Sequence, residues 1–130
     1  KQFIKKHNLD RITFYRLKPQ QGTLFEKKKP ITSKYYVEWI KKTRKEFPKI
    51  KIIAGSWLTH LNEIHLLLNA GANAITKFPS ISKFNTKYAK TIEAEAKKAN
   101  RKFIGTLTKV PNIKTKDSSV NKYLKRMKTN

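Results

Sequence analysis

Three short apolar runs of this chain end in, or are followed by, residues able to bind a ligand. The possible ligand-binding residues are Arg16, Lys18, Gly22 and Thr23 at the first run, Gly55, Ser56 and Trp57 after the second, and Lys77 after the third. Arginine and lysine bind carboxylates and phosphates, tryptophan stacks on planar rings, and glycine lets a ligand approach the backbone closely. Ordinary interpretations stand beside these: a random cation in a lysine-rich chain, an aromatic ring packed between helices, or a plain glycine turn.

Neither a catalytic pair nor a metal site is predicted. The chain has no cysteine, which excludes disulfides, zinc thiolate sites and iron–sulfur ligation by its own residues. His60 and His65 fall on one predicted helix at a spacing that does not place both on one face, so we interpret them as surface residues. Glu63 is interpreted as a charge that complements the helix dipole. No nucleophile with a neighbouring base is evident, and catalytic residues stay unknown.

Strands and helices alternate along the chain. Apolar, β-branched runs predict strands at 12–17, 50–54 and 72–77, and 103–107 is either a last strand or a docking extension. The run at 50–54 is almost continuously apolar, which is typical of a strand buried on both faces. Helices are predicted from Ser33 to Phe47, from Thr59 to a stop at Gly71, and from residue 85 or 86 through Ala99.

Repeated strand–helix units predict a parallel sheet with right-handed crossovers. The units recur at ~25 to 38 residues, as in (β/α) barrels, where active sites gather at the carboxyl ends of the strands. We therefore predict a partial (β/α) TIM-type barrel of three to four parallel units in residues 1–108, followed by a basic polar tail, 109–130, with one weak helix. A small open α/β domain is the alternative.

Two segments resemble the biotin-synthase-like radical S-adenosylmethionine enzymes. They are "YRLKPQQGTLFE", residues 15–26, and "AGSWLTHLNEIHLLLNAGANAI", residues 54–75. The first resembles the family's strand and Gly-Thr-Pro-Leu loop, with Leu24 where proline is usual. The second resembles a late strand with its Ala-Gly turn, helix and Ala-Gly-Ala-Asn run. The resemblance implies S-adenosylmethionine contacts at Gly22, Thr23, Gly55, Ser56 and Trp57, and substrate contacts at Arg16, Lys18 and Lys77.

The chain departs from that family in one decisive feature. It lacks the Cys-x3-Cys-x2-Cys loop that holds the family's four-iron cluster. The resemblance therefore implies a C-terminal part, either a fragment or a split-gene subunit, that is inactive alone and whose partner segment carries the cluster. Sulfur insertion into a small-molecule or protein-bound substrate, as in biotin or lipoyl synthesis, is one outcome among several. Ser56 replaces the family's arginine, so a second cluster is not expected.

The formal net charge of +23 suggests an alternative function. Clustered cations displace phosphate counterions, so the chain could be a basic nucleic-acid-binding module. The lysine-rich composition of a thermophile explains the same charge, since the cations are spread along the chain. A half-barrel closed by self-association is a third interpretation. No apolar run reaches the roughly 18 residues of a membrane span, and residues 1–9 lack an apolar leader, which together predict a cytoplasmic protein.

Overall fold

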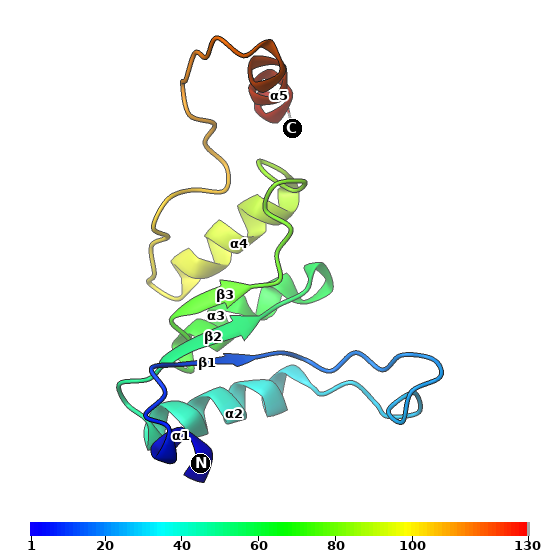
Figure 1. The fold of residues 1–130 in the computed structure, drawn as a ribbon, viewed down its shortest axis with the longest axis vertical. Helices are drawn as coiled ribbons and strands as arrows, with labels where there is room; N and C mark the ends of the chain where they lie inside the picture. Colours follow the sequence, from blue (N-terminus) through cyan, green and yellow to red (C-terminus); the bar gives the residue numbers. More distant parts are fainter. Residues whose placement is uncertain (130) are drawn as a thin grey trace.

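The computed structural model describes residues 1–129, and its centre is a parallel sheet of three strands in the order β1-β2-β3 (Figure 1). The strands are β1 (Arg11–Phe14), β2 (Lys51–Gly55) and β3 (Ala74–Thr76). Helix α2 (Ser33–Glu46) joins β1 to β2, and the 3-10 helix η1 (Leu58–Glu63) with helix α3 (Ile64–Asn69) joins β2 to β3. The outer helices are α1 (Gln2–Lys6), α4 (Lys87–Lys98) and α5 (Ser118–Lys128).

The prediction of a TIM-type barrel is wrong. The sheet is open, since β1 and β3 each pair with β2 alone, and three strands do not close into the eight-stranded ring of that fold. Alternating strands and helices produce the same sequence pattern in an open sheet and in a barrel, so the pattern does not distinguish them. The chain has a small open α/β fold.

The strand register divides the sheet into two different faces, because paired residues of parallel strands point to the same side. On one side lie Ile12, Phe14, Ile52, Ala54 and Ile75, which pack with α2 and α3 in a hydrophobic core. On the other side Ile53 lies between Thr13 and Ala74, and it is only half-buried. The expectation that residues 50–54 are buried on both faces is therefore wrong.

Helix α2 begins at Ser33, the residue predicted to cap it, and is therefore capped one residue earlier than predicted. Thr32, not Ser33, is the N-cap residue, and its hydroxyl oxygen accepts a hydrogen bond from the Tyr35 amide at 3.2 Å. The buried side chains Tyr36, Ile40 and Thr43 follow the helical spacing i, i+4, i+7 and face the sheet. Ser33 is thereby free to bond elsewhere, as described below.

A second core lies between α4 and the η1–α3 segment. It contains Leu61, Ile64 and Leu68 on one side and Ile92, Ala96 and Ala99 on the other. Phe103 and Leu107 pack partly against it without forming a strand, so of the two alternatives residues 103–107 are a docking extension. Glu93 holds this extension by accepting the Leu107 amide at 2.7 Å and the hydroxyls of Thr106 and Thr108. Burial raises the pKa of Glu93, but these hydrogen bonds outweigh it and lower the pKa overall.

The predicted C-terminal tail contains the helix that the sequence predicts, which is α5 (Ser118–Lys128). Asp117 caps it by accepting the amides of Ser119 and Val120, and none of its residues is buried. Residue 130 of the predicted tail lies outside the described residues. Across residues 1–129, each helix is too short or too polar to cross a membrane.

Gly71 ends α3 as predicted, in a left-handed conformation with φ of 113°. A Cβ there would lie 2.7 Å from Cγ of Arg44, whose guanidinium donates to the carbonyl oxygens of Gly71, Pro48 and Ile50. We expect Gly71→Ala to lower the free energy of unfolding by about 1–3 kcal/mol, from backbone strain and displacement of Arg44. Urea unfolding followed by circular dichroism measures this.

Gly105→Ala is the matched control for that prediction. Gly105 also has a positive φ, of 91°, but nothing lies within 4 Å of its missing Cβ. Its substitution should cost only the conformational strain, and equal losses in the two variants would show that contact with Arg44 is unimportant.

Candidate functional site

Four residues lie close together where the three strands end. Tyr15 directly follows β1, Gly55 ends β2, Trp57 lies two residues further, and Lys77 directly follows β3. The Lys77 ammonium lies 4.8 Å from the centre of the Tyr15 ring and 5.7 Å from that of Trp57. The carboxyl ends of parallel strands share one edge of a sheet, which brings these distant residues together. We call these four residues the strand-end site.

Gly55 is needed in this site because the Tyr15 ring lies directly over it. A Cβ on Gly55 would be 2.4 Å from Cδ1 of Tyr15, closer than any side chain permits. Lys77 has φ of 72°, a left-handed conformation that is uncommon and strained for a residue with a Cβ. Strain of this kind persists only where the surrounding structure imposes the conformation. At Lys77 the strained backbone carries a side chain whose ammonium lies close to both aromatic rings.

The strand-end site is open to solvent. Tyr15 is 54% exposed and Trp57 is 44% exposed, so part of each ring is accessible to a partner. A cation beside aromatic rings is stabilised by the ring quadrupoles and remains able to bind an anion. The arrangement suits a ligand that combines a planar ring with a carboxylate or phosphate. Such a ligand would stack on an aromatic ring and bind Lys77.

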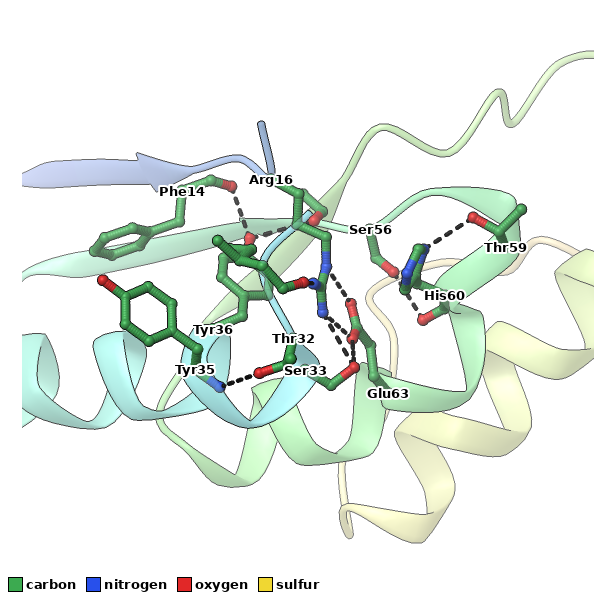
Figure 2. A network of polar contacts seen from close by, with 12 residues as sticks. Phe14, Arg16, Thr32, Ser33, Tyr35, Tyr36, Ser56, Thr59, His60 and Glu63 are labelled. Carbon is green, nitrogen blue, oxygen red and sulfur yellow. Dashed lines mark hydrogen bonds and ion pairs between the residues drawn. The ribbon is translucent and has the colours of Figure 1, made fainter. Parts of the chain in front are cut away.

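A buried polar network (Figure 2) adjoins this site, because Arg16 follows Tyr15 in the chain and the Tyr36 hydroxyl contacts the carbonyl oxygen of Gly55. Arg16 forms an ion pair with Glu63, and their side chains are only 6% and 5% exposed. Arg16 also donates to Ile31 O and, at 3.2 Å, to Ser33 Oγ, so protein atoms accept four of its five N–H groups. Ser33 in turn donates to Glu63 at 2.6 Å. The network joins the chain after β1 to the start of α2 and to η1.

Tyr36 connects the network to the strand ends. The Arg16 guanidinium lies over the Tyr36 ring at 4.8 Å, and the Tyr36 hydroxyl lies 2.9 Å from the carbonyl oxygen of Phe14 and 3.2 Å from that of Gly55. Burial raises the pKa of Tyr36 to about 12, so the phenol stays protonated and donates to these carbonyls. The ends of β1 and β2 are thereby held at a fixed separation.

The structure brings some of the predicted ligand-binding residues together and separates others. Gly55, Ser56, Trp57 and Lys77 adjoin one another at the strand ends, although Ser56 is fully buried and its hydroxyl donates to His60 O at 3.0 Å. Arg16 belongs to the adjoining buried network, with Glu63 as its partner. Lys18, Gly22 and Thr23 belong to the loop between β1 and α2, which extends away from the sheet (Figure 1). Their contacts with a ligand stay predictions.

Two residues of this region were not predicted. The predicted strand 12–17 includes Tyr15, whereas β1 ends at Phe14, and the alternation of side chains along a strand indicates that Tyr15 and Phe14 point to opposite faces. Glu63 lies at the N-cap of α3, in agreement with its prediction as a charge at a helix N-terminus, but its burial against Arg16 was not predicted. In a chain with only 8 acidic residues, a glutamate among apolar helix positions was a signal for an internal partner.

A second buried carboxylate joins α4 to the start of α3. Glu95 of α4 accepts from His65 Nδ1 at 2.5 Å and from Lys98 Nζ at 2.6 Å, so the surface interpretation of His65 is wrong in part. Burial raises the pKa of Glu95, but its bonds to Lys98 and His65 outweigh this and lower the pKa. In residues 1–129 no group of three or more acidic or histidine side chains is placed to hold a metal ion.

Comparison with known proteins gives one match of high similarity. An uncharacterized protein of Methanocaldococcus jannaschii is 45% identical over 107 residues. The match covers 82% of this chain but only 30% of that protein. No protein-family model matches the chain, and no solved structure matches it. This chain therefore spans less than a third of the length of its relative, and the remaining length has no counterpart here.

Proposed function

We propose that this chain is one segment of a radical S-adenosylmethionine enzyme and forms one wall of its cofactor and substrate pocket. The observation that carries the proposal is the strand-end site, where the Lys77 ammonium lies beside the rings of Tyr15 and Trp57 and the Tyr15 ring lies over Gly55. The two resembling segments, 15–26 and 54–75, both end or begin at this site. The M. jannaschii relative, more than three times as long as the match, is consistent with further segments. A cytoplasmic location is part of the proposal.

The residues at the strand ends fit S-adenosylmethionine but not an iron–sulfur cluster. S-adenosylmethionine contains an adenine ring and a carboxylate. The adenine can stack on Trp57 or Tyr15, and the carboxylate can bind Lys77. A chain without cysteine offers no thiolate ligands, so another segment would have to hold the cluster. Held there, the cluster would supply the electron for the reductive cleavage of S-adenosylmethionine. This chain's part is to bind and orient the cofactor or substrate and to exclude water from one side.

The test uses a reconstituted complex, made by co-expressing this chain with the part of the M. jannaschii relative outside the matched residues. We expect the complex to bind iron under anaerobic reconstitution and to form 5′-deoxyadenosine on reduction. Lys77→Met should weaken S-adenosylmethionine or substrate binding about 10- to 150-fold, because a charge-assisted hydrogen bond contributes about 1.5–3 kcal/mol. Lys90→Met, at an exposed position of α4, is the matched control. A complex that neither binds iron nor cleaves the cofactor contradicts the proposal.

Nucleic-acid binding is the second candidate, and the large net charge of +23, to which the C-terminal tail contributes, supports it. Residues 109–129 alone carry seven Lys and Arg against the single acidic residue Asp117. Affinity of this kind rests on counterion release and falls steeply with salt. Titration of a duplex and a single strand at several salt concentrations distinguishes the two functions. Binding with a steep salt slope and no sequence preference would show charge alone, whereas a preferred sequence would support this second function.

A further inference from the structure

An apolar groove of ≈ 700 Å³ runs beside β1, between α1 and α2. Its apolar lining is Ile4, Ile12, Phe14, Trp39 and Phe47, and its rim carries Lys1, Lys42 and Lys45 together with Glu46. Trp39 is 47% exposed, which is unusual for so large an apolar side chain. A patch of apolar surface framed by charges is typical of a surface that contacts another polypeptide.

The backbone of β1 along this groove has no strand beside it. The carbonyl oxygen of Asp10 accepts a hydrogen bond from the Lys51 amide, so the backbone of Asp10 faces β2. The N–H and C=O groups of Arg11 and Thr13 therefore point away from β2. This follows because peptide groups alternate in direction along a strand. β1 has β2 as its single partner in the sheet of residues 1–129. The edge can therefore accept one further strand.

We infer that this edge and groove bind a β-strand, with the helix connected to it, from another segment of the longer protein. An added strand would bond to Arg11 and Thr13, and its alternate side chains would lie over Ile12 and Phe14. The helix would cover Trp39 and Phe47. Its chemistry is acidic, because Lys42 and Lys45 border the groove and this chain carries a net charge of +23. The same charge disfavours a second copy of this chain as the occupant.

The inference rests on the part of the proposed function that makes this chain one segment of a longer protein, and not on the cofactor. The M. jannaschii relative supports that part, since more than two thirds of its length lies outside the match. Formation of the complex and its iron chemistry are separate readouts, so either can fail alone. If the segments associate but bind no iron, the inference stands while the proposed enzymatic function does not.

Thr13→Pro tests the free edge directly. Proline removes an N–H that points away from β2, so the pairing of β1 with β2 keeps its hydrogen bonds while the added strand loses one. Co-expressed with the unmatched part of the M. jannaschii relative, wild-type chain should form a soluble complex. Thr13→Pro should weaken it more than tenfold, and Thr13→Val, which keeps the N–H, should not. Hydrogen exchange should show the amides of Arg11 and Thr13 protected only in the complex.

A second pair of variants tests the groove. Trp39→Glu should weaken the complex, whereas Tyr123→Glu on α5, 42% exposed and outside the groove, should leave it unchanged. The inference is overturned if wild-type chain recovers no complex, or if Thr13→Pro and Trp39→Glu bind as tightly as wild type. Dimers of this chain alone that Thr13→Pro dissociates would likewise overturn it, by showing a second copy in the groove.

Discussion

Glu63→Ala is expected to lower the free energy of unfolding by about 3–5 kcal/mol, because it leaves the Arg16 guanidinium buried without a counter-ion. The two side chains are only 6% and 5% exposed, so water cannot replace the lost partner. Ser33 loses an acceptor at the same time. Because small domains are stabilised by only about 5–15 kcal/mol, the loss is a large share of the total. Urea unfolding followed by far-ultraviolet circular dichroism measures it.

The control for this prediction is Glu46→Ala. Glu46 also pairs with cations, Lys1 at 2.9 Å and Lys5 at 3.4 Å, but on the exposed surface, so its loss should change stability far less. The double variant Arg16→Met with Glu63→Leu should regain most of the stability, since it removes both buried charges together. If Glu63→Ala unfolds at the same urea concentration as wild type, Arg16 is not confined as the structure indicates.

The positions of the carboxyl ends of β2 and β3 could be predicted from sequence, but which side chains are buried there could not. Apolar runs bounded by Gly55 and by Lys77 indicate where these strands end, and parallel pairing then places the two ends at one edge. That reasoning correctly brought Trp57 and Lys77 together. It could not tell that Arg16, only one residue beyond Tyr15, turns inward. Its partner Glu63 lies 47 positions further along the chain, and no local pattern relates the two.

Local patterns also could not show how the units assemble, which explains why the predicted fold class was wrong. Helical periodicity identified α2 and α4, including the buried positions Tyr36, Ile40 and Ile92. Whether a set of strand–helix units stays open or closes into a ring depends on how many strands pair, which lies beyond any single unit. The loop with Gly22 and Thr23 shows a related difficulty. Its glycine marks a turn at φ of 76°, but no local pattern places that turn relative to the sheet.

Gly55→Ala is expected to reduce S-adenosylmethionine cleavage by the reconstituted complex about 100-fold, a prediction that rests on the proposed function. The added Cβ would lie 2.4 Å from Cδ1 of Tyr15 and 3.2 Å from the carbonyl oxygen of Phe14. Tyr15 is half-exposed and can swing outward, so the chain should still fold with a small loss of stability. Its ring then leaves Lys77, and a displacement of about 1 Å at a binding site can cost a factor of about 100 in rate.

Gly22→Ala distinguishes the strand-end site from the loop that the sequence also indicated. Gly22 has φ of 76°, and nothing lies within 4 Å of its missing Cβ, so alanine there adds strain without touching another residue. If the pocket is formed at the strand ends, the Gly22 variant should cleave S-adenosylmethionine at nearly the wild-type rate while the Gly55 variant does not. Cleavage is measured as 5′-deoxyadenosine, and melting temperature shows that both variants fold. The opposite ranking, with Gly22→Ala inactive and Gly55→Ala active, would move the site to the loop and remove Tyr15 and Lys77 from it.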